Sequence, residues 1–131
     1  EDTHSFNLIM DAFGMPKSNE AEKAARKQAI QNATKYAIEV PFKTIQRSFD
    51  VFEICAAMIE KGNPNSVTDA GVGVLCARAA VMGAYLNVKI NASSLEDKVF
   101  ADEMVSKAHA YVVKAQQLES ELMKKVEEVI G

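Results

Sequence analysis

The sequence contains few of the residues that build metal centres, disulfides or membrane spans. Its two histidines, His4 and His109, lie far apart and outside any cluster of metal ligands. Its two cysteines, Cys55 and Cys76, stand singly inside helical patterns, and no uninterrupted apolar run approaches the roughly 20 residues of a membrane span. No secretory signal peptide is visible. We therefore expect no metal site, no membrane partner, and a cytoplasmic protein whose cysteines are reduced and buried.

An excess of basic residues is also missing. The chain has 131 residues with 15 lysines and arginines against 18 acidic residues, which gives a net charge of −3. Nucleic-acid binding favours a strongly basic surface, so this balance argues against a nucleic-acid partner. It does not exclude a small anionic ligand, because such a ligand needs only a local cluster of cations.

Only three prolines and six glycines interrupt the chain, and the stretches between them have the period of helices. Apolar residues recur at steps of three and four, and no strand pattern or internal repeat is present. Pro41 is expected to break or kink the helix that precedes it. The sequence therefore predicts one all-α domain over residues 1–131, an antiparallel bundle of about five long helices. The expected helices cover residues 3–13, 18 or 19 to 40, 42–61, 66–91, and 95 to nearly the end.

The fourth expected helix carries an unusual stripe of small and polar residues. Its members follow steps of three and four and so share one helical face. Glycine inside a helix costs about 1 kcal/mol relative to alanine, which suggests that these positions serve a close helix contact or a groove. We expect Gly83→Leu to cost several kcal/mol through overpacking. The stripe consists of Asp69, Gly73, Cys76, Ala80, Gly83, Asn87 and Asn91.

Four polar side chains in these patterns are candidates for a site. Asp2 heads an apolar stripe, and it is either a helix N-cap or a carboxylate at the rim of a groove, where it could move protons. Asp69 follows Ser66 by three residues, a spacing that a capping box explains. Asn87 and Asn91 either tie helices together or bind a ligand with donor and acceptor edges, such as a heteroaromatic ring of pterin type.

A set of short motifs then runs along most of the chain in a fixed order. It resembles the cyclodeaminase/cyclohydrolase family, which includes the C-terminal domain of formimidoyltransferase-cyclodeaminase. The resemblance extends to about Ala108, and the rest of the last helix is generic. The motifs are Asp2-x-x-x-Phe6, Met15-Pro16-Lys17, Arg26, Val40-Pro41, Gly62-Asn63, Thr68-Asp69, Asn87-x-x-Ile90-Asn91 and Leu95-x-Asp97-x-x-Phe100.

The resemblance implies an all-helical domain that forms a homodimer or higher homo-oligomer, with its active site in a groove near the interface. It implies the closure of 5-formimidoyltetrahydrofolate to 5,10-methenyltetrahydrofolate with release of ammonia, with Asp2 as the catalytic residue. A tetrahydrofolate derivative would be the substrate, and no tightly bound cofactor is expected. The alternatives are a methenyltetrahydrofolate cyclohydrolase on the same scaffold and a non-enzymatic helical dimerisation module.

The resemblance also suggests residues that bind the substrate. Lys17 and Arg26 are candidates to hold the anionic glutamate tail of the folate, and the further candidates are Asn63, Asp69, Asn87 and Asn91. A formimidoyltransferase is implied as a partner or fused domain. Family domains begin with further helices that this sequence lacks, and it starts at Glu1 without a methionine, so we expect it to be part of a longer polypeptide.

Overall fold

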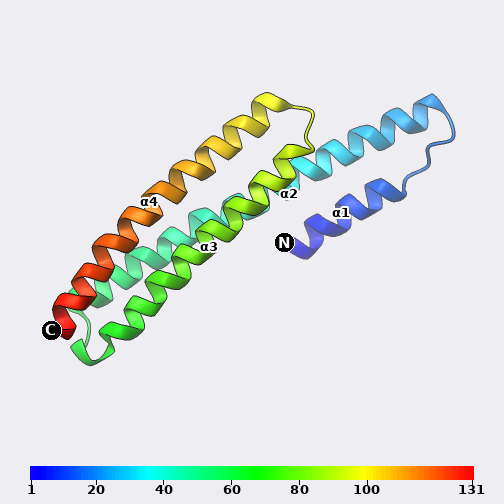
Figure 1. The fold of residues 1–131 in the computed structure, drawn as a ribbon. Helices are drawn as coiled ribbons and strands as arrows, with labels where there is room; N and C mark the ends of the chain where they lie inside the picture. The colour runs from blue at the N-terminus through cyan, green and yellow to red at the C-terminus, as the bar shows by residue number, and fades with distance from the viewer.

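The computed structural model describes all 131 residues and contains helices and no strands (Figure 1). This confirms the all-α class, although four long helices are present instead of about five. α2, α3 and α4 lie side by side with alternating directions, and α1 packs along the first half of α2. The elements in chain order are α1 (Asp2–Gly14), α2 (Glu20–Lys61), the short 3₁₀ helix η1 (Pro64–Ser66), α3 (Val67–Ser93) and α4 (Lys98–Ile130).

The helix count differs from the prediction because α2 continues through Pro41 for 42 residues. Proline has no N–H to donate to the carbonyl four residues earlier, here that of the buried Ala37. In the structure the side chain of Asn91, on α3, takes the place of this donor: Nδ2 lies 2.9 Å from the Ala37 carbonyl oxygen. A tertiary hydrogen bond thus compensates for the proline, and the two expected helices are one.

Local side-chain caps define two of the helix starts. Asn19 Oδ1 accepts from the Glu22 N–H at the start of α2, and Asp97 Oδ1 accepts from the Phe100 N–H at the start of α4. The prediction of a capping box at the start of α3 is wrong, because the Ser66 side chain makes no cap hydrogen bond. Asp69 nevertheless lies in the first turn of α3, where a negative charge suits the helix dipole.

The core lies between α2, α3 and α4, and its residues repeat at intervals of seven. Such a heptad spacing keeps one apolar seam of each helix turned towards its neighbours. The α4 seam is rich in alanine, which allows that helix to approach the branched side chains of the other two closely. The buried series are Ile38, Ile45, Phe52 and Ile59 on α2, then Val67, Val74, Val81 and Val88 on α3, and Ala101, Ala108, Ala115 and Leu122 on α4.

The small-residue stripe of α3 does not form the close helix contact that we expected along its length. A Cβ at Gly73 would lie 2.7 Å from the Cys55 sulfur, so α2 and α3 do approach closely there. A Cβ at Gly83 would meet nothing within 4 Å, so the prediction that Gly83→Leu overpacks the helix contact is wrong for the single chain. Cys76 is exposed, in contrast to the prediction, whereas Cys55 is buried. Burial, together with the nearby Cys76, raises the pKa of the Cys55 thiol.

The outer face of α3 remains apolar and uncovered. Four large apolar side chains of this helix are exposed: Val72, Leu75, Leu86 and Ile90. By length and composition alone, the helix over Pro64–Ser93 could cross a membrane, although the sequence has no uninterrupted apolar run of that length. A core helix of a soluble protein has the same composition, so this property alone does not indicate a membrane segment.

Candidate functional site

Three of the predicted site residues come together where the start of α1 meets α2 and α3. Asp2, Asn87 and Asn91 line one small pocket of about 200 Å³. Its other walls are mainly apolar side chains of α1 and of the part of α2 around Pro41. The remaining lining residues are Ser5, Phe6, Ile9, Ala37, Pro41 and Ile90.

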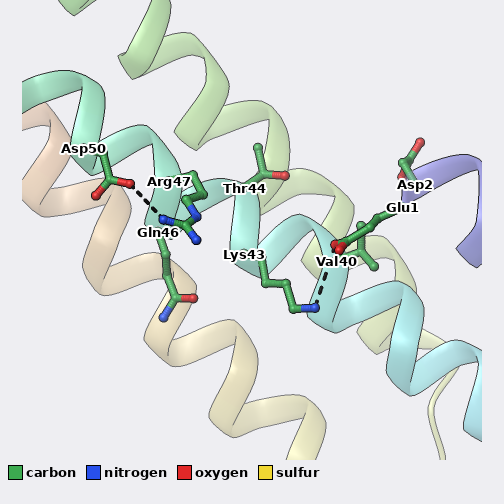
Figure 2. Close-up of a pocket in the computed structure, with 8 residues that line it drawn as sticks. All are labelled: Glu1, Asp2, Val40, Lys43, Thr44, Gln46, Arg47 and Asp50. Carbon is green, nitrogen blue, oxygen red and sulfur yellow. Dashed lines mark hydrogen bonds and ion pairs between the residues drawn. The ribbon is translucent and has the colours of Figure 1, made fainter.

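Asp2 is positioned by the first turn of α1 but is not its cap. The N-cap is Glu1, so the capping interpretation of Asp2 is wrong. The Asp2 backbone carbonyl accepts a hydrogen bond from Ser5 Oγ at 2.7 Å. In Figure 2 the Asp2 side chain is drawn without an interaction to any of the other residues shown. An exposed carboxylate at a cavity rim can exchange a proton with a bound molecule.

The two asparagines differ in what they do within the chain. Asn91 is half-buried and ties α3 to α2 through the Ala37 carbonyl. Asn87 is exposed and lies one turn earlier on the same pocket wall. The sequence left open whether these amides join helices or face a ligand. The structure assigns the helix tie to Asn91 and leaves the Asn87 amide accessible from the pocket.

A larger cleft of about 880 Å³ opens on the other side of Asp2, along the outer face of α2 (Figure 2). Two cations line it. Lys43 Nζ lies 3.8 Å from a carboxylate oxygen of Glu1, and Arg47 Nη1 lies 3.3 Å from one of Asp50. All four side chains are largely exposed. Such pairs are weak in water, so a ligand carboxylate could replace either acidic partner.

A third cavity, of about 470 Å³, adjoins the 880 Å³ cleft on the side of α4. Gln46 lines both cavities, and two lysines of α4, Lys107 and Lys114, line the far one. Phe42 and Tyr111 form its apolar part and meet edge to face, with ring centroids 5.9 Å apart. The four cations of these two cavities were not predicted. Lys43 and Arg47 lie one turn apart on α2, but nothing in the sequence relates that face to Asp2.

Lys17 and Arg26 lie elsewhere, and neither lines a cavity that Asp2 lines. Lys17 is in the loop between α1 and α2. Arg26 donates from Nε and Nη2 to the Phe13 carbonyl oxygen, each at 3.2 Å, and its guanidinium carbon lies 5.5 Å from the centre of the Phe13 ring. Arg26 therefore closes the last turn of α1. Substrate binding by these two residues stays a prediction.

Asn63 and Asp69 lie at the opposite end of α3 from the pocket. Asp69 and Asn87 are 18 residues apart in sequence, which corresponds to about 27 Å along the helix. Asn63 Oδ1 accepts a hydrogen bond from the Asn65 N–H at 3.0 Å and so shapes η1. The structure does not bring this pair to Asp2 within one chain, and their role in binding also stays a prediction.

Comparison with known proteins places this arrangement in a family. The family model described as formiminotransferase-cyclodeaminase matches residues 1–110. The chain belongs to this family. The resemblance found in the sequence motifs is thereby confirmed, and the relatives are enzymes that process folates.

Individual relatives extend beyond the region that this chain matches. The chain is 36% identical over 131 residues to a methenyltetrahydrofolate cyclohydrolase of Methylorubrum extorquens, and it spans 63% of that protein. It is 33% identical over 102 residues to a formimidoyltransferase-cyclodeaminase of Gallus gallus, covering 78% of this chain and 19% of that protein. The crystal structure of formiminotetrahydrofolate cyclodeaminase from Thermotoga maritima superposes with a TM-score of 0.81 at 25% identity, covering 99% of this chain and 61% of that one.

Proposed function

We propose that this chain carries the active region of a formimidoyltetrahydrofolate cyclodeaminase, an ammonia lyase of folate one-carbon metabolism. The observation that supports this most is the position of Asp2 between two unlike cavities. On one side is a small pocket with the amides of Asn87 and Asn91, and on the other is a cleft with the cations Lys43 and Arg47. A folate has the same order: a heteroaromatic ring, then the reacting N5 and N10, then a benzoyl group and an anionic glutamate tail.

The reaction requires one proton to leave N10 and one to reach the departing nitrogen. N10 attacks the carbon of the N5-formimidoyl cation, and the new N10–C bond gives a tetrahedral adduct as Asp2 takes the N10 proton. Asp2 then returns this proton to the amino group, the C–N bond to that group breaks, and ammonia leaves. The product is the methenyl cation, whose delocalised charge an adjacent carboxylate stabilises. Holding N10 against the formimidoyl carbon supplies further rate acceleration.

A methenyltetrahydrofolate cyclohydrolase is the second candidate. The 36% identity over the whole chain with the Methylorubrum extorquens cyclohydrolase favours it. That reaction begins at the same carbon: water adds to the methenyl cation, a proton leaves, and the ring opens to the formyl product. Asp2 could accept the proton from the attacking water. The two reactions therefore share a site and differ in the nucleophile that attacks this carbon.

The two activities and the catalytic role of Asp2 are tested together. The full chain is incubated with 5-formimidoyltetrahydrofolate or with the methenyl compound, and the methenyl absorbance is followed. A rise in the first sample supports the cyclodeaminase, and a fall in the second beyond the uncatalysed rate supports the cyclohydrolase. Asp2→Asn should lower kcat by about 10²- to 10⁴-fold while folate still binds. Unchanged turnover in Asp2→Asn would exclude Asp2 as the proton carrier, and no reaction with either folate would favour a non-enzymatic helical module.

We also infer that the active protein is a homodimer. α3 carries apolar residues on its outer face as well as on its core face, and a helix that is apolar on both of these faces is normally buried. Within one chain it leaves Val72, Leu75, Leu86 and Ile90 exposed, and a second copy could cover them. Light scattering after gel filtration should give twice the mass of one chain. The formimidoyltransferase-cyclodeaminases of Gallus gallus and Dictyostelium discoideum are matched over 19% and 22% of their length, which supports a transferase as a fused domain or partner.

A further inference from the structure

We propose that Pro41 is a positioning residue for the substrate's ring, because it fixes which atom of the Asn91 amide faces the small pocket beside Asp2. This inference rests on the proposed function. It assigns to the pocket a fixed hydrogen-bond acceptor, Asn91 Oδ1, which selects a ring edge that carries an N–H or an amino group. Pro41 offers the ligand no polar side-chain group of its own and acts through its neighbours.

The chemistry of the Ala37 carbonyl decides how the Asn91 amide is turned. Rotation about the last bond of an asparagine side chain exchanges a donor, Nδ2, for an acceptor, Oδ1. The Ala37 oxygen can only accept, and Ala37 is buried, with 4% of its surface exposed. If Oδ1 faced it, two acceptors would meet in a buried contact. Nδ2 therefore points towards α2 and lies 2.9 Å from the Ala37 oxygen.

Pro41 makes this orientation necessary. In a regular helix the N–H of residue 41 would bond to the Ala37 carbonyl four residues earlier, and the Asn91 amide would be free to turn either way. Proline has no N–H, and a buried acceptor left without a donor is costly. The carbonyl therefore depends on the Nδ2 of Asn91, and one of the two amide orientations is excluded.

The oxygen of the same amide is open to a molecule in the pocket. Asn91 lines this pocket together with Asp2 and Pro41. The side chain of Asn91 is engaged within the chain only through Nδ2. The one buried side-chain nitrogen or oxygen atom without a partner is Arg78 Nε, so the unpartnered Oδ1 of Asn91 is not buried. Since Nδ2 is turned to α2, Oδ1 is the atom that a ligand meets.

A reduced pterin ring has donor groups that suit a fixed acceptor. Its pyrimidinone part carries an amino group and ring N–H groups. Asn87 is exposed on the same wall of the pocket, and no proline-dependent carbonyl fixes its amide, so this side chain can donate or accept. One fixed acceptor beside one adaptable amide distinguishes the edges of the ring and so decides how the ring lies in the pocket.

The expected effect follows from the cost of ordering one side chain. An amide that is already oriented before the ligand arrives avoids that cost at the moment of binding. Releasing a single polar side chain corresponds to about a two- to tenfold rise in Kd. Pro41→Ala should have this effect, because it returns a backbone donor to the Ala37 carbonyl and leaves the Asn91 amide free to turn.

The test is a double-mutant cycle in folate affinity, measured by calorimetry on the full chain with the stable reduced folate 5-formyltetrahydrofolate. Pro41→Ala should raise Kd about two- to tenfold. In an Asn91→Ala background the same substitution should change Kd by less than about twofold, because the amide that it releases is gone. An Asn87→Ala background is the matched control, and there Pro41→Ala should keep its full effect. Circular dichroism checks that each variant is folded at the assay temperature.

Turnover gives a second measurement that a general loosening of the fold would not reproduce. The substrate is the folate that wild type converts, 5-formimidoyl- or 5,10-methenyltetrahydrofolate. Pro41→Ala should raise KM by about the same factor as Kd and leave kcat within about twofold, because the interaction that is weakened holds the ring in the ground state and the transition state alike. Asp2 itself is unchanged in this variant.

The outcomes separate this inference from the proposed function. An equal Kd for wild type and Pro41→Ala would overturn the role of Pro41 while the folate site stands. An equal loss of affinity in the wild-type and Asn91→Ala backgrounds would show a direct contact of Pro41 with the ligand, and that result overturns the action through Asn91. A fall in kcat at constant KM would overturn it as well. If wild type binds no folate, the proposed function fails, and this inference fails with it.

Discussion

The hydrogen bond between Asn91 and Ala37 makes a sharp stability prediction. Pro41 leaves the buried Ala37 carbonyl without its helical donor, and Asn91 Nδ2 supplies one at 2.9 Å. Asn91→Ala removes that donor and leaves a buried acceptor unpaired, which costs about 1–3 kcal/mol. For a domain of this size each kcal/mol lowers Tm by about 4 °C. Urea denaturation followed by circular dichroism measures the free energy of unfolding directly.

Two further variants show whether the proline is the cause. In a Pro41→Ala background the backbone of residue 41 regains an N–H that can bond to the Ala37 carbonyl. Asn91→Ala should then cost about 1 kcal/mol less than it does in wild type, which is a coupling energy that a double-mutant cycle reports. Asn87→Ala removes the same amide from an exposed position, so it should change stability by less than about 0.5 kcal/mol. An equal cost for Asn91→Ala in both backgrounds would refute this explanation.

The remaining predictions concern a helix cap and a glycine. A hydrogen bond from Lys35 lowers the pKa of the Asp97 carboxyl, and the hydrogen bond from the Phe100 N–H lowers it further. The ionised carboxylate therefore stabilises the fold at pH values above its unfolded pKa of about 4. This stabilisation is lost as the pH falls through the lower pKa of the folded state. Asp97→Asn should therefore be less stable than wild type in urea at pH 7, with a difference that shrinks below about pH 4; the same difference at pH 2.5 and pH 7 would contradict this. Gly73→Ala should lower the free energy of unfolding by about 1–3 kcal/mol, because the new Cβ would overlap the Cys55 sulfur. In a Cys55→Ala background, which lacks that sulfur, the same substitution should cost less. Unchanged stability of Gly73→Ala would contradict the close contact.

The positions of the helices followed from the sequence because the signals are local. Steps of three and four between apolar residues predicted the helices now seen as α1, α3 and α4 and both parts of α2. The effect of Pro41 could not be predicted in the same way. Whether a proline ends a helix depends on whether another group can satisfy the carbonyl it leaves unpaired, and here that group is 50 residues away on α3.

The small-residue stripe shows a similar limit. Its spacing correctly placed seven residues on one side of α3, but spacing does not say what lies opposite. Gly73 faces the Cys55 sulfur, whereas Gly83 faces open space in the single chain. A glycine that accommodates a neighbouring helix and one that does not have the same sequence signature.

The sequence by itself determined the helical class, the family, and Asp2, Asn87 and Asn91 as polar residues to examine. These depend on residue type and on order along the chain. The packing of α1 along α2 decided that the three residues share one pocket, and the packing of α3 against α2 decided that Asn91 is engaged within the protein. The same packing places four unpredicted cations in the cavities beyond Asp2. The physical reason is that a pocket is formed by faces of different helices. Which faces meet is set by the packing of the whole core and not by any local motif.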